Sequence, residues 1–185
     1  LKLRQCSLLA DVSSLAGCAS LHSLDLQACY KISDVSALAG CSSLHMLYRT
    51  ACFQLPKVLD LTGCACLHTL NFSCCYQLTD VSVVVRYAYL HTLNLSGWSA
   101  LTDVSALAGS VNLHMLSLRK CYHLTDVSSL AVCATLHTLD LMRCFQLTDV
   151  SALVGCVSLH TLDLSRCYGI TDVSTLAGCS SLYSL

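Results

Sequence analysis

Histidine is the side chain of this sequence that most invites a chemical role, because seven of the eight His residues recur every 23 residues. They form the His column: His22, His45, His68, His91, His114, His137 and His160. Neighbouring imidazoles could share a metal ion, but zinc ligands converge on one point, whereas a column is a line. We therefore expect no metal, and His side chains that bond a neighbouring turn or water. Because unperturbed imidazoles titrate near ~6.5, we also hypothesise that the array loosens, or changes its partner affinity, below about pH 6.

Cysteine recurs at the same interval, and thirteen of the fifteen Cys residues fall in two columns. The first Cys column is Cys6, Cys29, Cys52, Cys75, Cys121, Cys144 and Cys167, and the second is Cys18, Cys41, Cys64, Cys133, Cys156 and Cys179. Trp98, Tyr87 and Ser110 fill the gaps, and no partner residue changes in step with them. We therefore predict free thiols that behave as small buried apolar side chains. Free thiols favour an intracellular, reducing compartment, the cytoplasm or nucleus before an organelle.

Two further columns have structural explanations. An Asp precedes each Val-Ser-x-Leu segment, where a carboxylate caps a turn, and we prefer this role to a row of calcium or catalytic ligands. An aromatic residue follows the first Cys column, and we expect these rings to cover the end of the core, with a ligand-binding row as the alternative. The Asp column is Asp11, Asp34, Asp80, Asp103, Asp126, Asp149 and Asp172, and the aromatic column is Tyr30, Phe53, Tyr76, Tyr122, Phe145 and Tyr168.

The patterns typical of catalysis are missing from the sequence. It has no nucleophile beside a base in an irregular loop, no Gly-rich phosphate loop and no isolated carboxylate pair. His and Ser occur in nearly every repeat, so their coexistence carries no specificity. We expect a protein without enzymatic activity, without a cofactor and without a small-molecule ligand.

One repeated unit must position all these columns, and residues 159–181 are its clearest copy. The alternation of Leu162, Asp163 and Leu164 predicts a short strand with one buried face in each repeat. Strands that recur in one direction pair in parallel, and about twenty residues suffice for each crossover. Asp before and Gly after the apolar turn predict a brief helix or 3-10 turn on the opposite side. The fold class is therefore an α/β solenoid.

The chain is expected to be a single domain over residues 1–185 with about eight repeats of 23 residues. Its first and last residues, Leu1 and Leu185, occupy the same position of the repeat, and neither end has the polar outer face that caps an array. We therefore expect a fragment of a longer chain.

The third repeat is the least regular. Arg49 occupies a core Leu position, Lys57 replaces the Asp of the Asp column, and Pro56 is the single proline of the chain. We expect a bulge or a local change of register there.

The repeat carries a family resemblance across the whole chain. Leu-x-x-Leu-x-Leu-x-x-Cys-x-x-Leu-Thr-Asp resembles the leucine-rich repeat. Residues 144–149 resemble the cysteine-containing subtype of F-box-type ubiquitin-ligase receptors, and residues 149–153 are similar to the short repeats of internalins and related phosphatase-regulating proteins. The resemblance implies a right-handed superhelix with the parallel sheet on its concave face and short helical or 3-10 turns on its convex face.

Composition limits the partners. The net charge is −1, so no global field recruits nucleic acid or an anionic membrane. No apolar run approaches the ~18 to 20 residues of a membrane-spanning helix. We therefore expect another protein as the partner, with no nucleic acid and no membrane span.

Positions where the repeats disagree are the candidate binding residues. Numbering the repeat from Leu159 as position 1, position 5 faces out of the sheet and varies, and positions 7 and 8 follow the strand and are basic in three consecutive repeats. Parallel strands lie roughly 4.8 Å apart, so these residues form columns on one surface. The position 5 candidates are Tyr48, Asn71, Asn94, Asp140 and Asp163, and the basic edge is Arg119, Lys120, Arg143 and Arg166.

The predicted function is a non-enzymatic interaction scaffold whose concave face and strand-end edge bind a partner. The basic edge would contact an acidic partner, or would be a solvated face neutralised by Asp140 and Asp163. Two other functions stay open: a structural or linker subunit of a larger assembly, and the substrate-recognition part of a ubiquitin-ligase receptor.

Overall fold

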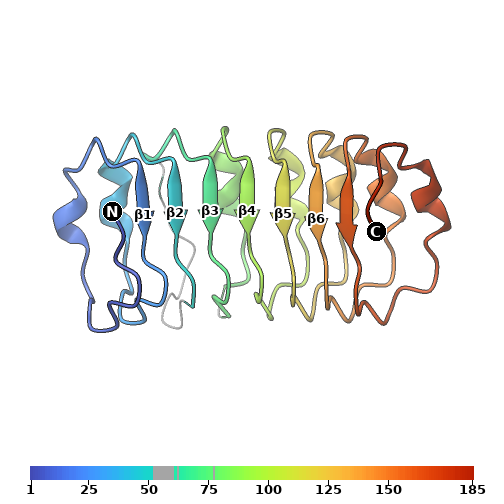
Figure 1. Ribbon diagram of the computed structural model, residues 1–185, viewed down its shortest axis with the longest axis horizontal. Coiled ribbons are helices and arrows are strands. Elements are labelled where there is room, and N and C mark those ends of the chain that lie inside the picture. Colours follow the sequence, from blue (N-terminus) through green and yellow to red (C-terminus); the bar gives the residue numbers. More distant parts are fainter. Residues whose placement is uncertain (52–60, 62, 77) are drawn as a thin grey trace.

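The computed structural model describes residues 1–51, 61, 63–76 and 78–185, and in this part of the chain it has seven strands in one sheet. Every strand pairs in parallel with the next one along the chain (Figure 1). The strands are β1 Ser23–Asp25, β2 Met46–Tyr48, β3 Thr69–Asn71, β4 Thr92–Asn94, β5 Met115–Ser117, β6 Thr138–Asp140 and β7 Thr161–Asp163. The predicted solenoid with one short strand per repeat is confirmed.

The register of the sheet follows the repeat, because each residue pairs with the one 23 positions later, as Leu139 pairs with Leu162. The central Leu of every strand is buried, and its two neighbours face out of the sheet. The terminal turns splay beyond the strands at both ends of the array, so that the sheet lies on the inner side of the curve (Figure 1).

Short 3-10 turns form the opposite side of each repeat. They are η1 Ser13–Leu15, η2 Ser36–Gly40, η3 Ser82–Arg86, η4 Ser105–Gly109, η5 Ser128–Val132, η6 Ser151–Gly155 and η7 Ser174–Gly178. Within the described residues, no helix has the length and apolar character needed to cross a membrane.

The Asp column starts these turns, as predicted. The carboxylate of Asp34 accepts the backbone N–H of Ser36 at 2.7 Å and its hydroxyl at 3.0 Å, and Asp172 does the same for Ser174. These hydrogen bonds favour the ionised acid, so they lower the pKa of both Asp residues.

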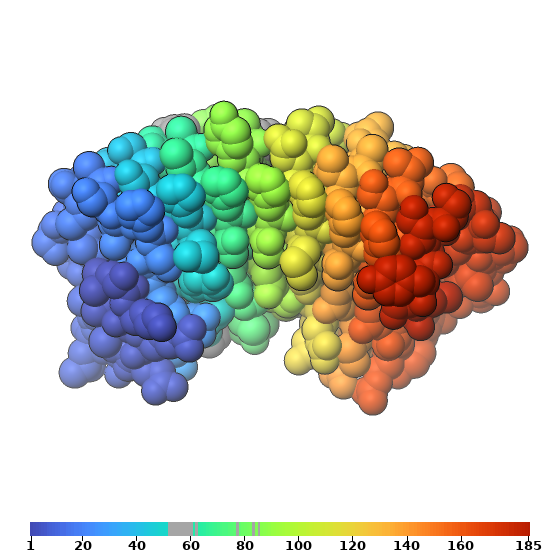
Figure 2. All heavy atoms as spheres, turned by 45° about the horizontal axis from the view of Figure 1, so that its top comes forward, coloured from blue at the N-terminus to red at the C-terminus, as the bar shows by residue number. Residues whose placement is uncertain are grey.

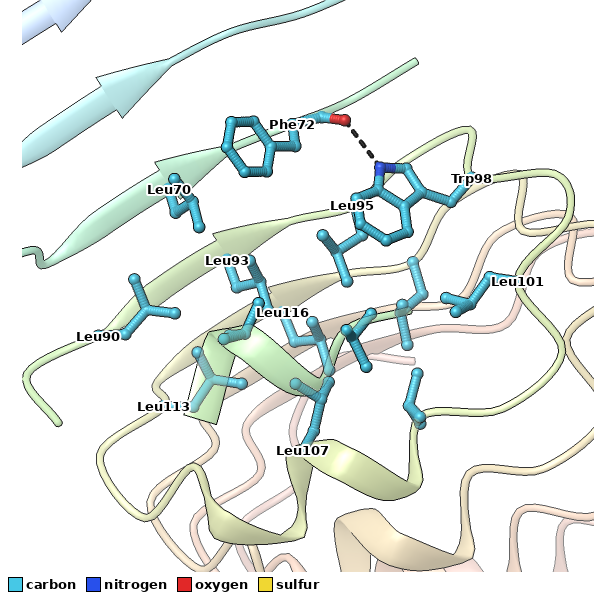
Figure 3. Close-up of a cluster of buried hydrophobic side chains, with 14 of the residues drawn as sticks. Leu70, Phe72, Leu90, Leu93, Leu95, Trp98, Leu101, Leu107, Leu113 and Leu116 are labelled. Carbon is cyan, nitrogen blue, oxygen red and sulfur yellow. Dashed lines mark hydrogen bonds between the residues drawn. The ribbon is translucent and has the colours of Figure 1, made fainter. Parts of the chain in front are cut away.

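Leucine and cysteine fill the space between the sheet and the turns, and the thiols have a second role there. Ten of the described Cys side chains donate to a backbone carbonyl of the preceding repeat, at 2.9 to 3.8 Å. Trp98 replaces a Cys and keeps this bond, because its Nε1–H donates to the carbonyl of Phe72 at 2.8 Å (Figure 3). Tyr87 replaces another Cys, and its hydroxyl accepts the N–H of Leu61. The columns therefore satisfy buried backbone groups between repeats.

The irregular third repeat keeps its strand in register, since β2 pairs with β3 without an offset. Arg49 is 1% exposed and donates through Nη2 to the carbonyl of Ile32. Cys52, Phe53, Pro56 and Lys57 lie outside the described residues, so the expected bulge stays a prediction.

Candidate partner-binding face and edge

The position 5 candidates end their strands and point out of the sheet. Tyr48 ends β2, and the amide and carboxylate side chains end β3, β4, β6 and β7. An oxygen of each amide or carboxylate accepts the backbone N–H two residues later, over these distances: Asn71 to Ser73 3.0 Å, Asn94 to Ser96 2.9 Å, Asp140 to Met142 3.0 Å and Asp163 to Ser165 2.8 Å. These residues thus also hold the turn that follows the strand, a role that was not predicted from the sequence.

Position 8 of the repeat has left-handed backbone geometry throughout the described repeats. The φ angles lie between 58° and 79° at Gln5, Ala28, Ala51, Cys74, Gly97, Lys120, Arg143 and Arg166. This conformation costs a residue with a Cβ about 1–2 kcal/mol in conformational energy, and glycine adopts it without that cost. Three consecutive long cations therefore occupy a backbone position that would suit glycine better.

The basic edge has no acidic counterpart within the described chain. Arg119, Lys120 and Arg143 are half-buried and Arg166 is exposed, and none of the four forms an ion pair with a described residue. The nearby carboxylate of Asp140 instead accepts the hydroxyl of Ser117 at 3.2 Å. Direct neutralisation by Asp140 and Asp163, the alternative considered from the sequence, is not found among the described residues.

A pocket opens on this edge, below the ends of β3, β4 and β5. Its volume is about 270 Å³, and the space-filling view shows the edge hollowed between the green and the yellow repeats (Figure 2). The lining residues are Ser73, Cys74, Tyr76, Asn94, Ser96, Gly97, Arg119, Lys120 and Tyr122. The pocket brings together three predicted site residues, Asn94, Arg119 and Lys120. The other six are not among its lining residues.

Gly97 lines this pocket, and Ser99, two residues further along the chain, belongs to the same repeat. Gly97 occupies position 8 between Cys74 and Lys120, and Ser99 occupies position 10 between Tyr76 and Tyr122. Each of them stands where the neighbouring repeats have a longer side chain. This site was not predicted from the sequence, although the aromatic column carries a signal for it: Ser99 is the one interruption between Tyr30 and Tyr168.

Comparison with solved structures identifies the architecture. The chain superposes on internalin C2 of Listeria monocytogenes with a TM-score of 0.79 and 24% identity, over 100% of this chain and 79% of that one. The fold is a leucine-rich-repeat solenoid. A leucine-rich-repeat protein of Leptospira interrogans is also similar, with a TM-score of 0.59 and 14% identity over 100% of this chain and 65% of that one. No protein-family model matches the sequence, and no curated protein sequence matches it.

The His column of this leucine-rich-repeat solenoid is a continuous stack of rings. Neighbouring centroids are 4.8 to 5.3 Å apart from His22 to His160. In six of the seven residues, Nδ1 lies 2.5 to 2.7 Å from the carbonyl oxygen two residues earlier, which confirms the predicted bond to the neighbouring turn. No group of three or more possible metal ligands occurs among the described residues. The pH hypothesis stays a prediction.

The aromatic column of the solenoid differs from expectation. Tyr122 stacks on Phe145 with centroids 5.1 Å apart, and Phe145 stacks on Tyr168 at 5.4 Å. The exposed fractions are 40% for Phe145 and 75% for Tyr168, so these rings form a surface row and do not cover the core.

The thiols of the solenoid suit a donor role better than a nucleophilic one. Burial raises the pKa of Cys64 to about 11 and that of Cys121 and Cys156 to about 12, and it raises the pKa of Cys144 further. A thiol needs to ionise to act as a nucleophile, and these thiols stay protonated near neutral pH. Protonation also keeps the S–H donors on their carbonyls.

Proposed function

We propose that this solenoid is a non-enzymatic scaffold that binds a protein partner through its sheet face and its basic edge. Leucine-rich-repeat proteins are generally protein-interaction scaffolds. A stack of identical repeats offers an extended rigid surface, and binding to a rigid surface loses less conformational entropy.

One observation carries the proposal. Arg119, Lys120, Arg143 and Arg166 lie in three consecutive repeats, and no described carboxylate pairs with them. Cations concentrated on one edge attract acidic surfaces, speed association and discriminate against basic partners. The partner should therefore present Asp or Glu to this edge.

The sheet face supplies polar contacts next to the edge. Asn71 and Asn94 each use their side-chain oxygen for the following turn, which leaves the NH₂ groups to donate to a partner. Asp163 likewise has one oxygen on the N–H of Ser165, and the second can accept. Tyr48 lies at one end of this strip, Asp140 lies within it between Asn94 and Asp163, and both belong to the proposed contact surface.

We place this interaction in a reducing compartment. Ten described thiols donate to buried carbonyls, and oxidation would leave those carbonyls without their donor. The cytoplasm and the nucleus keep thiols reduced.

A random peptide library, displayed and selected on the purified chain, tests the proposal. We expect the selected peptides to be rich in Asp and Glu. Their affinity should fall by at least tenfold in the double variant Arg143→Glu and Arg166→Glu, because two attractive contacts become repulsive.

The matched control is the double variant Lys31→Glu and Arg86→Glu, which makes the same change in net charge away from the basic edge. It should retain the affinity of the original chain. Peptides without acidic residues, or equal binding to both double variants, would refute the proposed function.

A further inference from the structure

We infer that the pocket beside Gly97 and Ser99 binds an aromatic side chain from an acidic segment of the partner. The inference deepens the proposed function and rests on it, because Arg119 and Lys120 belong to both the pocket and the basic edge.

The aromatic column is interrupted at Ser99. On one side of Ser99 the column continues as stacked rings, since Tyr122, Phe145 and Tyr168 follow one another at 5.1 and 5.4 Å. On the other side it resumes at Tyr76. Two strand spacings, roughly 10 Å, separate Tyr76 and Tyr122, and one ring inserted between them would stack on both.

The pocket has room for an aromatic ring. Gly97 lacks a side chain at a position where the neighbouring repeats have Cys74 and Lys120. Cys74 and Tyr76 both line the pocket on the side of the preceding repeat. The volume of about 270 Å³ exceeds the roughly 150 Å³ of a cavity that accommodates benzene, so a phenol or indole ring fits.

The pocket is positively charged. Arg119 and Lys120 line it, and no hydrogen bond or ion pair joins either side chain to a described residue. Guanidinium and ammonium groups are attracted to ring faces and to carboxylates alike. A ring with acidic neighbours in the sequence would therefore meet both kinds of group at one place.

Polar side chains form the rim of the pocket. The hydroxyl of Ser96 lies 2.8 Å from the hydroxyl of Ser117, and the amide of Asn94 ends β4 beside it. A phenol or an indole N–H needs a polar partner when it is buried, and this rim can supply one.

Neither aromatic ring next to the gap enters the pocket: His123 bonds the carbonyl of Ser99 through Nδ1 at 2.6 Å without lining the pocket, and Trp98 turns away from it. Trp98 lies between Gly97 and Ser99, but it is 1% exposed and points into the core, where it bonds the carbonyl of Phe72 (Figure 3). Trp98 is not among the residues that line the pocket. The bulk of this repeat is thus directed inward, and its outer surface is left hollow.

Two synthetic peptides test the inference by calorimetric titration of the purified chain: Glu-Glu-Trp-Glu-Glu and its counterpart with Ala in place of Trp. We expect the Trp peptide to bind about tenfold more tightly. Ser99→Tyr should abolish that difference by filling the gap with the residue that the column otherwise carries. Ser99→Ala, which keeps the gap, should preserve it.

Further variants separate the two proposals. Tyr122→Ala should reduce the Trp-to-Ala difference by removing one stacking wall, and it substitutes for Ser99→Tyr if that variant does not fold. Arg143→Glu with Arg166→Glu should weaken both peptides and leave their ratio unchanged. Inorganic phosphate, which carries charge without a ring, should not displace the Trp peptide.

The outcomes are distinct. Equal binding of both peptides to the original chain overturns the inference and leaves the proposed function standing. A difference that survives in both Ser99→Tyr and Tyr122→Ala overturns the inference as well, as does displacement by phosphate, which would indicate a small-anion site. If neither peptide binds, both proposals fall.

Discussion

The same pair of repeat positions behaves differently at the N-terminal end and at the centre of the array. Arg4 and Arg119 occupy position 7, and Asp25 and Asp140 occupy position 5 of the following repeat. Arg4 Nε donates to Asp25, whereas Arg119 has no ion pair with a described residue and lines the pocket. Both Asp residues hold the following turn in the same way, through Gln27 and Met142.

The residue opposite each Asp differs as well. Ser117 lies opposite Asp140 in the sheet and donates its hydroxyl to the second carboxylate oxygen. Lys2 lies opposite Asp25, and there Arg4 takes that oxygen instead. At the centre a neutral hydroxyl, and not a guanidinium, bonds the second oxygen of the Asp, and we expect this bond to keep Arg119 available. The charge of a repeat position does not by itself decide whether it pairs.

Position 9 differs between the two regions as well. Cys29 Sγ donates to the carbonyl of Leu3, and Trp98 Nε1 donates to the carbonyl of Phe72. The bond is the same, but the indole fills far more of the core. The central repeat therefore combines extra bulk inside with a hollow outside.

The largest expected effect comes from Trp98→Cys, which would give the centre the residue of the N-terminal end. The thiol can still reach the carbonyl, but the lost indole leaves a cavity, and we expect a loss of about 3–5 kcal/mol in the free energy of unfolding. Cys29→Ala should cost about 1 kcal/mol, because it removes a small side chain near the end of the array. Urea unfolding followed by circular dichroism measures both, and equal costs would contradict the distinction.

Alkaline pH should separate the same two regions through Cys29 and Cys121. Burial raises the pKa of both thiols above 9.0, and that of Cys121 to about 12. The folded state then holds the proton more tightly, so this stability is fully present below pH 9.0 and is lost as the pH rises toward about 12. By about pH 10.5 the loss from Cys121 alone is on the order of 2 kcal/mol.

The variants Cys121→Ala and Cys29→Ala provide the measurement. Cys121→Ala should lose less stability than the original chain between pH 9 and about 10.5, and Cys29→Ala should differ less from the original chain. Unfolding midpoints at each pH show this, and parallel curves for all three proteins would rule it out.

The fold could be predicted from the sequence because every repeat buries side chains at the same positions. Leu139 and Leu162 are buried in adjacent strands at the same repeat position, and the 23-residue period sets that register. The turn of Asp34 and Ser36 was also predictable, since a carboxylate two residues before an N–H bonds it locally.

The site was less predictable because it depends on side chains of different repeats. The four cations were found as a break in the pattern, but the Ser117 hydroxyl that satisfies Asp140 depends on side-chain reach across strands. The left-handed backbone at Lys120 and Arg143 has no signal in their residue types, since such positions favour glycine. Ser99 was visible in the sequence, but its consequence needed the row of stacked rings.

The most direct test of the comparison removes the two arginines separately. Arg4→Ala leaves the carboxylate of Asp25, which is 3% exposed, without its cation, and we expect a cost of about 1–2 kcal/mol. Arg119→Ala should change stability by less than about 0.5 kcal/mol, because no described acid loses a partner.

Ser117→Ala extends this test from stability to binding. Without the hydroxyl, the second oxygen of Asp140 becomes available to Arg119, as that of Asp25 is to Arg4. We expect a few-fold weaker binding of acidic peptides with little change in stability, because a surface ion pair is worth at most about 1 kcal/mol. Adding Asp140→Asn should restore the affinity, since the neutral amide cannot hold the guanidinium as an ion. If Ser117→Ala binds acidic peptides as the original chain does, the hydroxyl is not what keeps Arg119 available, and the two ends of the array differ for another reason.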